Sequence, residues 1–171
     1  MRRVKLDRID RRILRDLQAD GRMTNVELAR RAGISAPPCL RRVRALEEAG
    51  FIRGYHADIN PEALGFGVTV FAQVGLSSQA EADLKKFEGM VNSWPEVREC
   101  SMLAGETDFL LKIVAADWDS YQRFLTTKLT AAPNVSHVKS ALAIRQSKYT
   151  PGVPIDVDVG PEVLEDEEDE E

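Results

Sequence analysis

The sequence predicts an α+β chain of three consecutive segments, and three observations support this division. Residues 1–60 hold 14 Lys and Arg against 8 Asp and Glu, and their apolar positions recur at helical spacing. Residues 61–150 alternate between stretches of β periodicity and stretches of helical periodicity. Residues 151–171 form an acidic tail that ends in "VLEDEEDEE". The net charge of −5 thus averages a basic front, a near-neutral middle and an acidic end, which predicts different partners for each.

The composition argues against several classes of protein. No apolar run approaches the roughly 18 residues of a membrane span, and the start "MRRVKLDRID" lacks the apolar core of a secretory signal. Cys39 and Cys100 lie far apart, which favours a reducing cytoplasm. Together with His56 and His137 they show neither metal-ligand spacing nor a nucleophile–base pair. We therefore expect a cytoplasmic protein with no membrane partner, no metal, no cofactor and no enzymatic activity.

The first two expected helices have clear start and stop signals. Residues 7–19 place apolar side chains on one face, with Asp7 as a plausible N-cap. Thr24 and Glu27 have the spacing of a capping box, in which both side chains satisfy free N–H groups at the start of the second helix. Gly33 can adopt the left-handed turn that ends this helix.

A third helix is expected from the stretch "ISAPPCLRRVRALEEAGFIRG". Ser35 would cap it, and Pro37 and Pro38 fit its first turn, where a missing N–H costs no hydrogen bond. The expected inward stripe leaves a basic outward face. The inward residues are Leu40, Val43 and Leu46, and the outward ones are Arg41, Arg42 and Arg44.

Two helices joined by a tight turn, the second rich in arginine, describe a helix-turn-helix. The following "FIRGYHADI" is expected to form two short strands about Arg53-Gly54, the wing of a winged helix-turn-helix domain. Arginine neutralises phosphates and bonds guanine edges, so the predicted partner is double-stranded DNA. The alternative is a solvated helix face whose arginines pair with Glu47 and Glu48. The predicted DNA contacts are Asn25, Arg30, Arg31, Ser35, Ala36, Pro37, Pro38, Cys39, Arg41, Arg42, Arg44 and Arg53.

The middle segment reads as a ferredoxin-like βαββαβ sandwich with helices on one sheet face. Because apolar residues such as Val70 and Phe71 occur on both faces of the first strand, the uncovered face is expected to pack on a second copy. The expected strands are 66–76, 97–103, 108–115 and 135–145, and the expected helices are 79–93 and 117–131.

The turn in "LAGETDFLL" is the candidate ligand site of this segment. Backbone N–H groups of a glycine-containing turn can hold a carboxylate, and the carboxylate of Asp108 can hold an ammonium. These are the two charged ends of a free α-amino acid. The alternative is an ordinary hairpin turn.

Residues 6–65, "LDRIDRRILRDLQADGRMTNVELARRAGISAPPCLRRVRALEEAGFIRGYHADINPEALG", resemble the N-terminal domain of the Lrp/AsnC family of leucine-responsive, feast/famine regulators. The resemblance continues nearly to residue 148. It implies a sequence-specific transcriptional regulator, bacterial or archaeal and nucleoid-associated, whose dimers assemble to tetramers or octamers. An architectural DNA-compacting protein without an effector is the alternative.

The resemblance also implies that the turn after residue 102 is the effector-binding loop, where dimers meet. Residues 141–143 are expected nearby, and Trp118 is alternatively a core residue. The implied contacts to an amino-acid effector are Leu103, Ala104, Gly105, Glu106, Thr107, Asp108 and Trp118.

The tail repels itself and has almost no apolar content, which predicts disorder. It can be a solubilising appendage, or it can compete with DNA for the arginine face.

Overall fold

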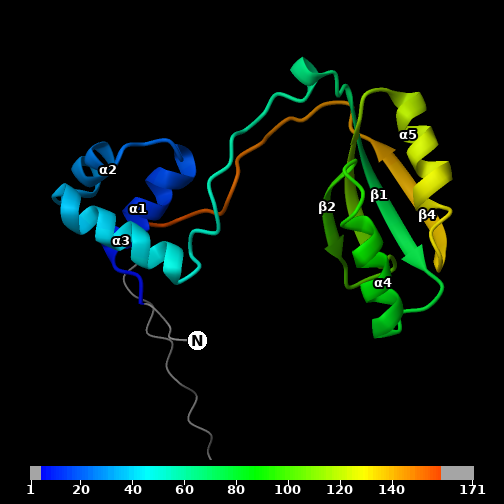
Figure 1. The fold of residues 1–171 in the computed structure, drawn as a ribbon, viewed down its shortest axis with the longest axis horizontal. Coiled ribbons are helices and arrows are strands. Elements are labelled where there is room, and N and C mark those ends of the chain that lie inside the picture. The colour runs from blue at the N-terminus through cyan, green and yellow to red at the C-terminus, as the bar shows by residue number, and fades with distance from the viewer. Residues whose placement is uncertain (1–4, 159–171) are drawn as a thin grey trace, which may run out of the picture. The chain divides into compact units, whose positions relative to one another are not determined.

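The computed structural model describes residues 5–158, and the chain divides into two compact units (Figure 1). One unit groups Met1–Asp58 with Tyr149–Glu171, and the other comprises Ile59–Lys148. The chain therefore passes between the units twice, once before and once after the second unit in the sequence. None of the helices in the described range is long and apolar enough to cross a membrane.

The first unit contains the three predicted helices. They pack around a small apolar core, so the helix-turn-helix expectation is confirmed. The helices are α1 (Arg8–Ala19), α2 (Asn25–Ala32) and α3 (Ala36–Glu48). The buried core residues are Ile13, Leu28, Ala29, Ala32, Cys39 and Leu46.

The helix starts follow the expected signals with one difference. The Asp7 carboxylate accepts a hydrogen bond from the Asp10 N–H at 2.8 Å. The Asp10 carboxylate in turn accepts one from the Asp7 N–H, which completes a capping box. Thr24 accepts from the Glu27 N–H at 3.3 Å, but the Glu27 side chain bonds Arg30 and Arg31 instead of the cap. The capping box predicted at Thr24 and Glu27 is thus only half formed, whereas at Asp7, where only an N-cap was predicted, a full box is present.

The start of α3 corrects two expectations. Gly33 has φ of 75°, the left-handed conformation predicted for it, and Ser35 stands at the N-cap position. However, the Ser35 side chain makes no capping hydrogen bond. Leu40 was predicted to face inward and is 40% exposed, whereas Cys39 is fully buried. Residues 39, 43 and 46 share one helix face, and Leu40 lies about 100° around the axis from Cys39.

The two short strands predicted about Arg53-Gly54 do not form, because the structure has no strand between α3 and Val68. A two-residue hairpin turn needs a positive φ. Of the glycines between α3 and Val68, Gly50 and Gly65 have one, but Gly54 does not. Residues 52–60 instead have no regular secondary structure, and the Tyr55 hydroxyl donates to Glu47 at 2.9 Å.

The second unit has the predicted βαββαβ order. Its four strands pair antiparallel in the order β2-β3-β1-β4, as in a ferredoxin-like sandwich. After Glu62–Leu64, a short 3₁₀ turn, the elements are β1 (Val68–Leu76), α4 (Glu81–Val91), β2 (Val97–Met102), β3 (Phe109–Ala115), α5 (Trp118–Phe124) with a further π turn (Leu125–Leu129), and β4 (Val135–Leu142).

The two faces of the sheet differ in burial. On β1, Val70, Ala72 and Val74 are fully buried against Phe87 of α4 and Tyr121 of α5. The alternate residue Phe71 faces away from these helices and is 40% exposed. In Figure 1 both helices lie on the same side of the sheet. No element within residues 5–158 covers the opposite face, as predicted.

Residues 149–158, which we call the C-terminal strap, belong to the first unit. The Gln18 side chain of α1 donates to the Val153 carbonyl at 2.8 Å and accepts from the Val153 N–H at 3.0 Å. Val157 is buried, and Arg8 of α1 pairs with Asp158 at 2.7 Å. The predicted disordered tail from residue 151 is thus wrong for residues 151–158, and residues 159–171 lie outside the described part of the chain.

Candidate nucleic-acid interface and effector turn

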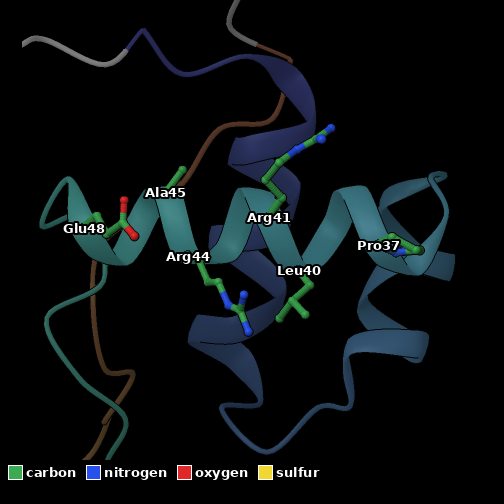
Figure 2. A pocket seen from close by; sticks show the side chains of 6 residues that line it. All are labelled: Pro37, Leu40, Arg41, Arg44, Ala45 and Glu48. Atoms are coloured by element: carbon green, nitrogen blue, oxygen red, sulfur yellow. The ribbon is translucent and has the colours of Figure 1, made fainter.

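The outward face of α3 forms a shallow groove with a basic rim. In Figure 2 the Arg41 and Arg44 side chains extend toward opposite sides of the helix, and Leu40 lies next to Arg41, on the side of Pro37. Within the described residues neither arginine forms an ion pair. Both guanidinium groups are therefore available to an anionic partner. The groove is lined by Pro37, Leu40, Arg41, Arg44, Ala45 and Glu48.

Arg42 has a different role from its neighbours in the sequence. Its Nη1 donates to Asp7 Oδ2 and to Asp10 Oδ1, both at 2.7 Å. Burial alone would raise the pKa of Asp7, but hydrogen bonds from the Asp10 N–H and from Arg42 outweigh it and leave that pKa below its ordinary value. The Arg42 side chain is only 33% exposed. This arginine holds α3 against the start of α1 and is not presented like Arg41 and Arg44.

Two further residues that were predicted to contact DNA instead make contacts inside the domain. Cys39 is fully buried, which raises the pKa of its thiol, so its side chain cannot reach a groove of DNA. Asn25 donates to the Ala36 carbonyl at 2.9 Å and so joins the start of α2 to the start of α3. We correct the assignment of Cys39 from a contact to a core residue.

Arg30 and Arg31 lie exposed on α2 and share one carboxylate. Arg30 makes two hydrogen bonds to Glu27, at 2.7 and 2.8 Å, and Arg31 makes one at 2.8 Å. The hydrogen bonds from Arg30 and then Arg31 lower the pKa of Glu27 to about 2. Glu27 thus offsets one of the two positive charges. Ser35, Pro37 and Arg53 are exposed, while Ala36 and Pro38 are half-buried.

Asp108, at the end of the turn between β2 and β3, is hydrogen-bonded to β1 through both its side chain and its backbone. The Leu76 N–H donates to Asp108 Oδ2 at 2.6 Å, and the Asp108 N–H donates to the Val74 carbonyl at 3.0 Å. Thr107 beside it is buried, while residues 103–106 are exposed. One carboxylate oxygen of Asp108 is therefore already used to fix the turn on β1.

The structure does not bring Trp118 to this turn. Residue 109 begins β3 and Ala115 ends it, so about 20 Å of strand separates the turn from α5, at roughly 3.3 Å per residue. Trp118 is 45% exposed and its ring lies 5.3 Å from that of Tyr121. Ala141 pairs with Phe71 in the register and lies farther from the turn than His137, which pairs with Gly75. The predicted effector set is thus divided between the two ends of one sheet.

Comparison with known proteins agrees with this architecture. Residues 69–153 match the Lrp/AsnC ligand binding domain, and residues 6–53 match a winged helix-turn-helix DNA-binding model. The leucine-responsive regulatory protein of Rhizobium meliloti (strain 1021) is 58% identical over 146 residues, which cover 85% of this chain and 94% of that protein. The chain belongs to the Lrp/AsnC family.

Two more relatives widen the comparison within the Lrp/AsnC family. The Bkd operon transcriptional regulator of Pseudomonas aeruginosa is 40% identical, over 89% of this chain and 99% of that protein. The crystal structure of a Neisseria meningitidis transcriptional regulator in complex with L-Met superimposes with a TM-score of 0.84 at 37% identity. That likeness covers 88% of this chain and 97% of the other. These relatives are transcriptional regulators, not enzymes.

Several features of this Lrp/AsnC chain escaped the sequence patterns. Leu40, Ala45 and Glu48 line the α3 groove without having been predicted there. The partners of Arg42 are more than 30 residues away, and no local signal points to them. The docking of the strap joins residues 135 positions apart. The alternation of apolar and acidic residues at 155–159, with Val157 at its centre, is the one local pattern that could have indicated it.

Proposed function

We propose that this DNA-binding transcriptional regulator reads duplex DNA with the outward face of α3. The face carries two arginines without intramolecular partners in the described range, and an exposed Leu40 next to Arg41. Arg41 and Arg44 would bond guanine edges or phosphates, and Leu40 would contact thymine methyl groups. The observation that carries this proposal is that Arg41 and Arg44 form no ion pair within the described residues, whereas Arg42 is paired with two carboxylates.

The remaining basic residues would contribute phosphate contacts. Arg30 and Arg31 are exposed on α2, and Arg53 is exposed after α3. At the start of α3 the exposed Ser35 hydroxyl makes no capping hydrogen bond and could donate to a phosphate, whereas Pro37 has no N–H and could only pack against the DNA backbone. Contacts of this kind set the register of a protein on DNA and carry no sequence information themselves.

We further propose that a free amino acid is the effector and binds at residues 103–108. The ligand-binding domain of the family and the L-Met complex of a relative support a small-molecule effector. Because Trp118 lies beyond the far end of β3, it can join the site only from a second copy of the chain. The effector would act through its different affinities for two assemblies of the protein.

Self-association is part of the proposal. The sheet face opposite α4 and α5 exposes Phe71 and is covered by no element within residues 5–158. A homodimer formed through this face would present two copies of α3 to successive major grooves. Assembly beyond the dimer, to a tetramer or octamer, would bring the two halves of the effector site together.

One titration tests the regulatory proposal against an architectural role. Binding of a labelled promoter duplex is followed while each of the twenty amino acids is added, with assembly size measured in parallel by light scattering. We expect one or a few amino acids to change both quantities. Tight DNA binding with no response to any of the twenty would favour the architectural DNA-compacting alternative.

A further inference from the structure

The C-terminal strap ends at the start of α1, next to the residue through which α1 contacts α3. Arg8 Nη2 donates to Asp158 Oδ1 at 2.7 Å. The residue before Arg8, Asp7, accepts from Arg42 of α3, also at 2.7 Å. Two ion pairs and one peptide bond therefore connect the last described residue of the strap to α3.

The sequence that follows this anchor is strongly acidic. Residues 159–171 hold eight Asp and Glu and no Lys or Arg. Thirteen residues span at most about 45 Å when extended, whereas the 13 residues of α3 are only about 20 Å long. The covalent connection at Asp158 thus allows these acidic residues to reach any part of α3.

The arginines of α3 differ in whether they pair with a carboxylate. Arg42 is paired with two carboxylates, as described above, and Arg8 is paired with Asp158. Arg41 and Arg44 have no such partner within residues 5–158. They are the guanidinium groups of α3 that remain for an anion, whether the anion is a phosphate or a carboxylate.

We propose that residues 159–171 bind the Arg41 and Arg44 face of α3 in the same chain and compete there with duplex DNA. This inference rests on the proposed function only in taking that face as the DNA contact. The contacts of the strap with α1 matter here, because they fix the point from which the acidic segment starts on the DNA-binding unit. A tail that left the chain at Lys148 would start from the other unit.

The size of the effect follows from tethering. A segment held by a short flexible connection has an effective concentration of the order of 1 mM. If the same segment in solution bound α3 with a Kd of about 0.1 mM, the free fraction of the face would fall about tenfold, and the DNA affinity with it. Salt weakens both interactions, so the difference caused by the tail disappears as ionic strength rises.

The test uses the full-length chain and a full-length variant in which the eight acidic residues of 159–171 are changed to Gln or Asn. The affinity for a 20-base-pair duplex of arbitrary sequence is measured by fluorescence anisotropy across a salt series. We expect the variant to bind about tenfold more tightly at low salt and with a steeper salt dependence, the two proteins converging at high salt. Equal affinities at low salt would overturn the tail proposal while leaving the DNA-binding proposal intact. Failure of both proteins to bind would contradict the DNA-binding proposal itself.

A second measurement locates the tail without using DNA affinity. A photoreactive amino acid replaces Glu167, and the crosslinked peptides are identified by mass spectrometry. We expect the crosslink on residues 36–48 and its loss when excess duplex is added. Crosslinks confined to the second unit, or formed only between two copies, would overturn binding within the same chain.

Discussion

Arg42 of α3 donates a hydrogen bond to Asp10 of α1 at 2.7 Å, across 32 residues of sequence. The Asp10 side chain is only 12% exposed, so this pair lies at the boundary of the domain core. The contact separates the three arginines of α3 into one that holds the fold and two that face outward. The predictions below follow from that separation.

Arg42→Ala is expected to destabilise the first unit by about 2 kcal/mol, because it leaves the largely buried Asp10 carboxylate without its cationic partner. Arg41→Ala is the matched control, since Arg41 is exposed and has no partner among the described residues. It should change stability by less than about 0.5 kcal/mol and weaken DNA binding. Urea denaturation and anisotropy on the same two proteins measure both effects. Equal stability of the two variants would contradict the division of roles.

Glu27→Gln is expected to tighten DNA binding. The substitution releases Arg30 and Arg31 from a carboxylate that now holds both. With a negative charge removed beside the proposed phosphate contacts, affinity should rise about three- to tenfold at low salt, with a steeper salt dependence. An unchanged or lower affinity would show that α2 does not lie near the DNA backbone.

The same variant tests the pH dependence of stability. The folded-state pKa of Glu27 is about 2, below its ordinary 4.5. Because the unfolded chain binds the proton more readily, this carboxylate contributes stability above pH 4.5 that is lost as the pH falls toward 2. Wild type should therefore lose stability more steeply than Glu27→Gln between pH 4.5 and 2 in urea titrations. Parallel curves would contradict the ion pairs.

Asp108→Asn is expected to abolish the amino-acid response while leaving DNA affinity intact. The amide oxygen can still accept the hydrogen bond from the Leu76 N–H, so the turn keeps its structure. Only the negative charge that would hold the ammonium of the ligand is removed. Glu62→Gln is the matched control, since this carboxylate of the same unit is exposed and lies outside residues 103–108. A normal response from Asp108→Asn in calorimetry would show that the effector lies elsewhere.

Val157→Asp is expected to destabilise the first unit by about 2 kcal/mol, because it places a charge where an apolar side chain is buried against the helices. Val153→Asp is the control, because Val153 is 65% exposed and contacts Gln18 through its backbone. Thermal unfolding of both variants measures the difference. If the two substitutions cost the same, the strap does not pack on α1 in solution.

Local signals in the sequence predicted the elements of this fold well. The caps at Asp7 and Thr24, the left-handed Gly33 and the alternation along β1 act within a few residues and appear in the structure as expected. The buried face of α3 was harder to predict, because both Cys39 and Leu40 complete an apolar stripe with residues 43 and 46. A thiol packs as a small apolar group, and here it takes the inner position.

Long-range relationships account for what the sequence could not predict. The engagement of Arg42 depends on how α3 crosses α1, and the separation of Trp118 from Asp108 depends on strand direction and length. The strap reaches α1 only because the chain returns from the second unit to the first. Each of these is a property of tertiary packing, which no short motif encodes.

The most direct test of the central claim is the affinity of the Arg41→Ala/Arg44→Ala double variant for a target duplex, measured at about 100 mM salt with its thermal midpoint as the check on folding. The account predicts a midpoint close to wild type and a loss of at least about 30-fold in affinity, from two lost guanidinium contacts of about 1–3 kcal/mol each. A folded double variant that binds the duplex as tightly as wild type would contradict it.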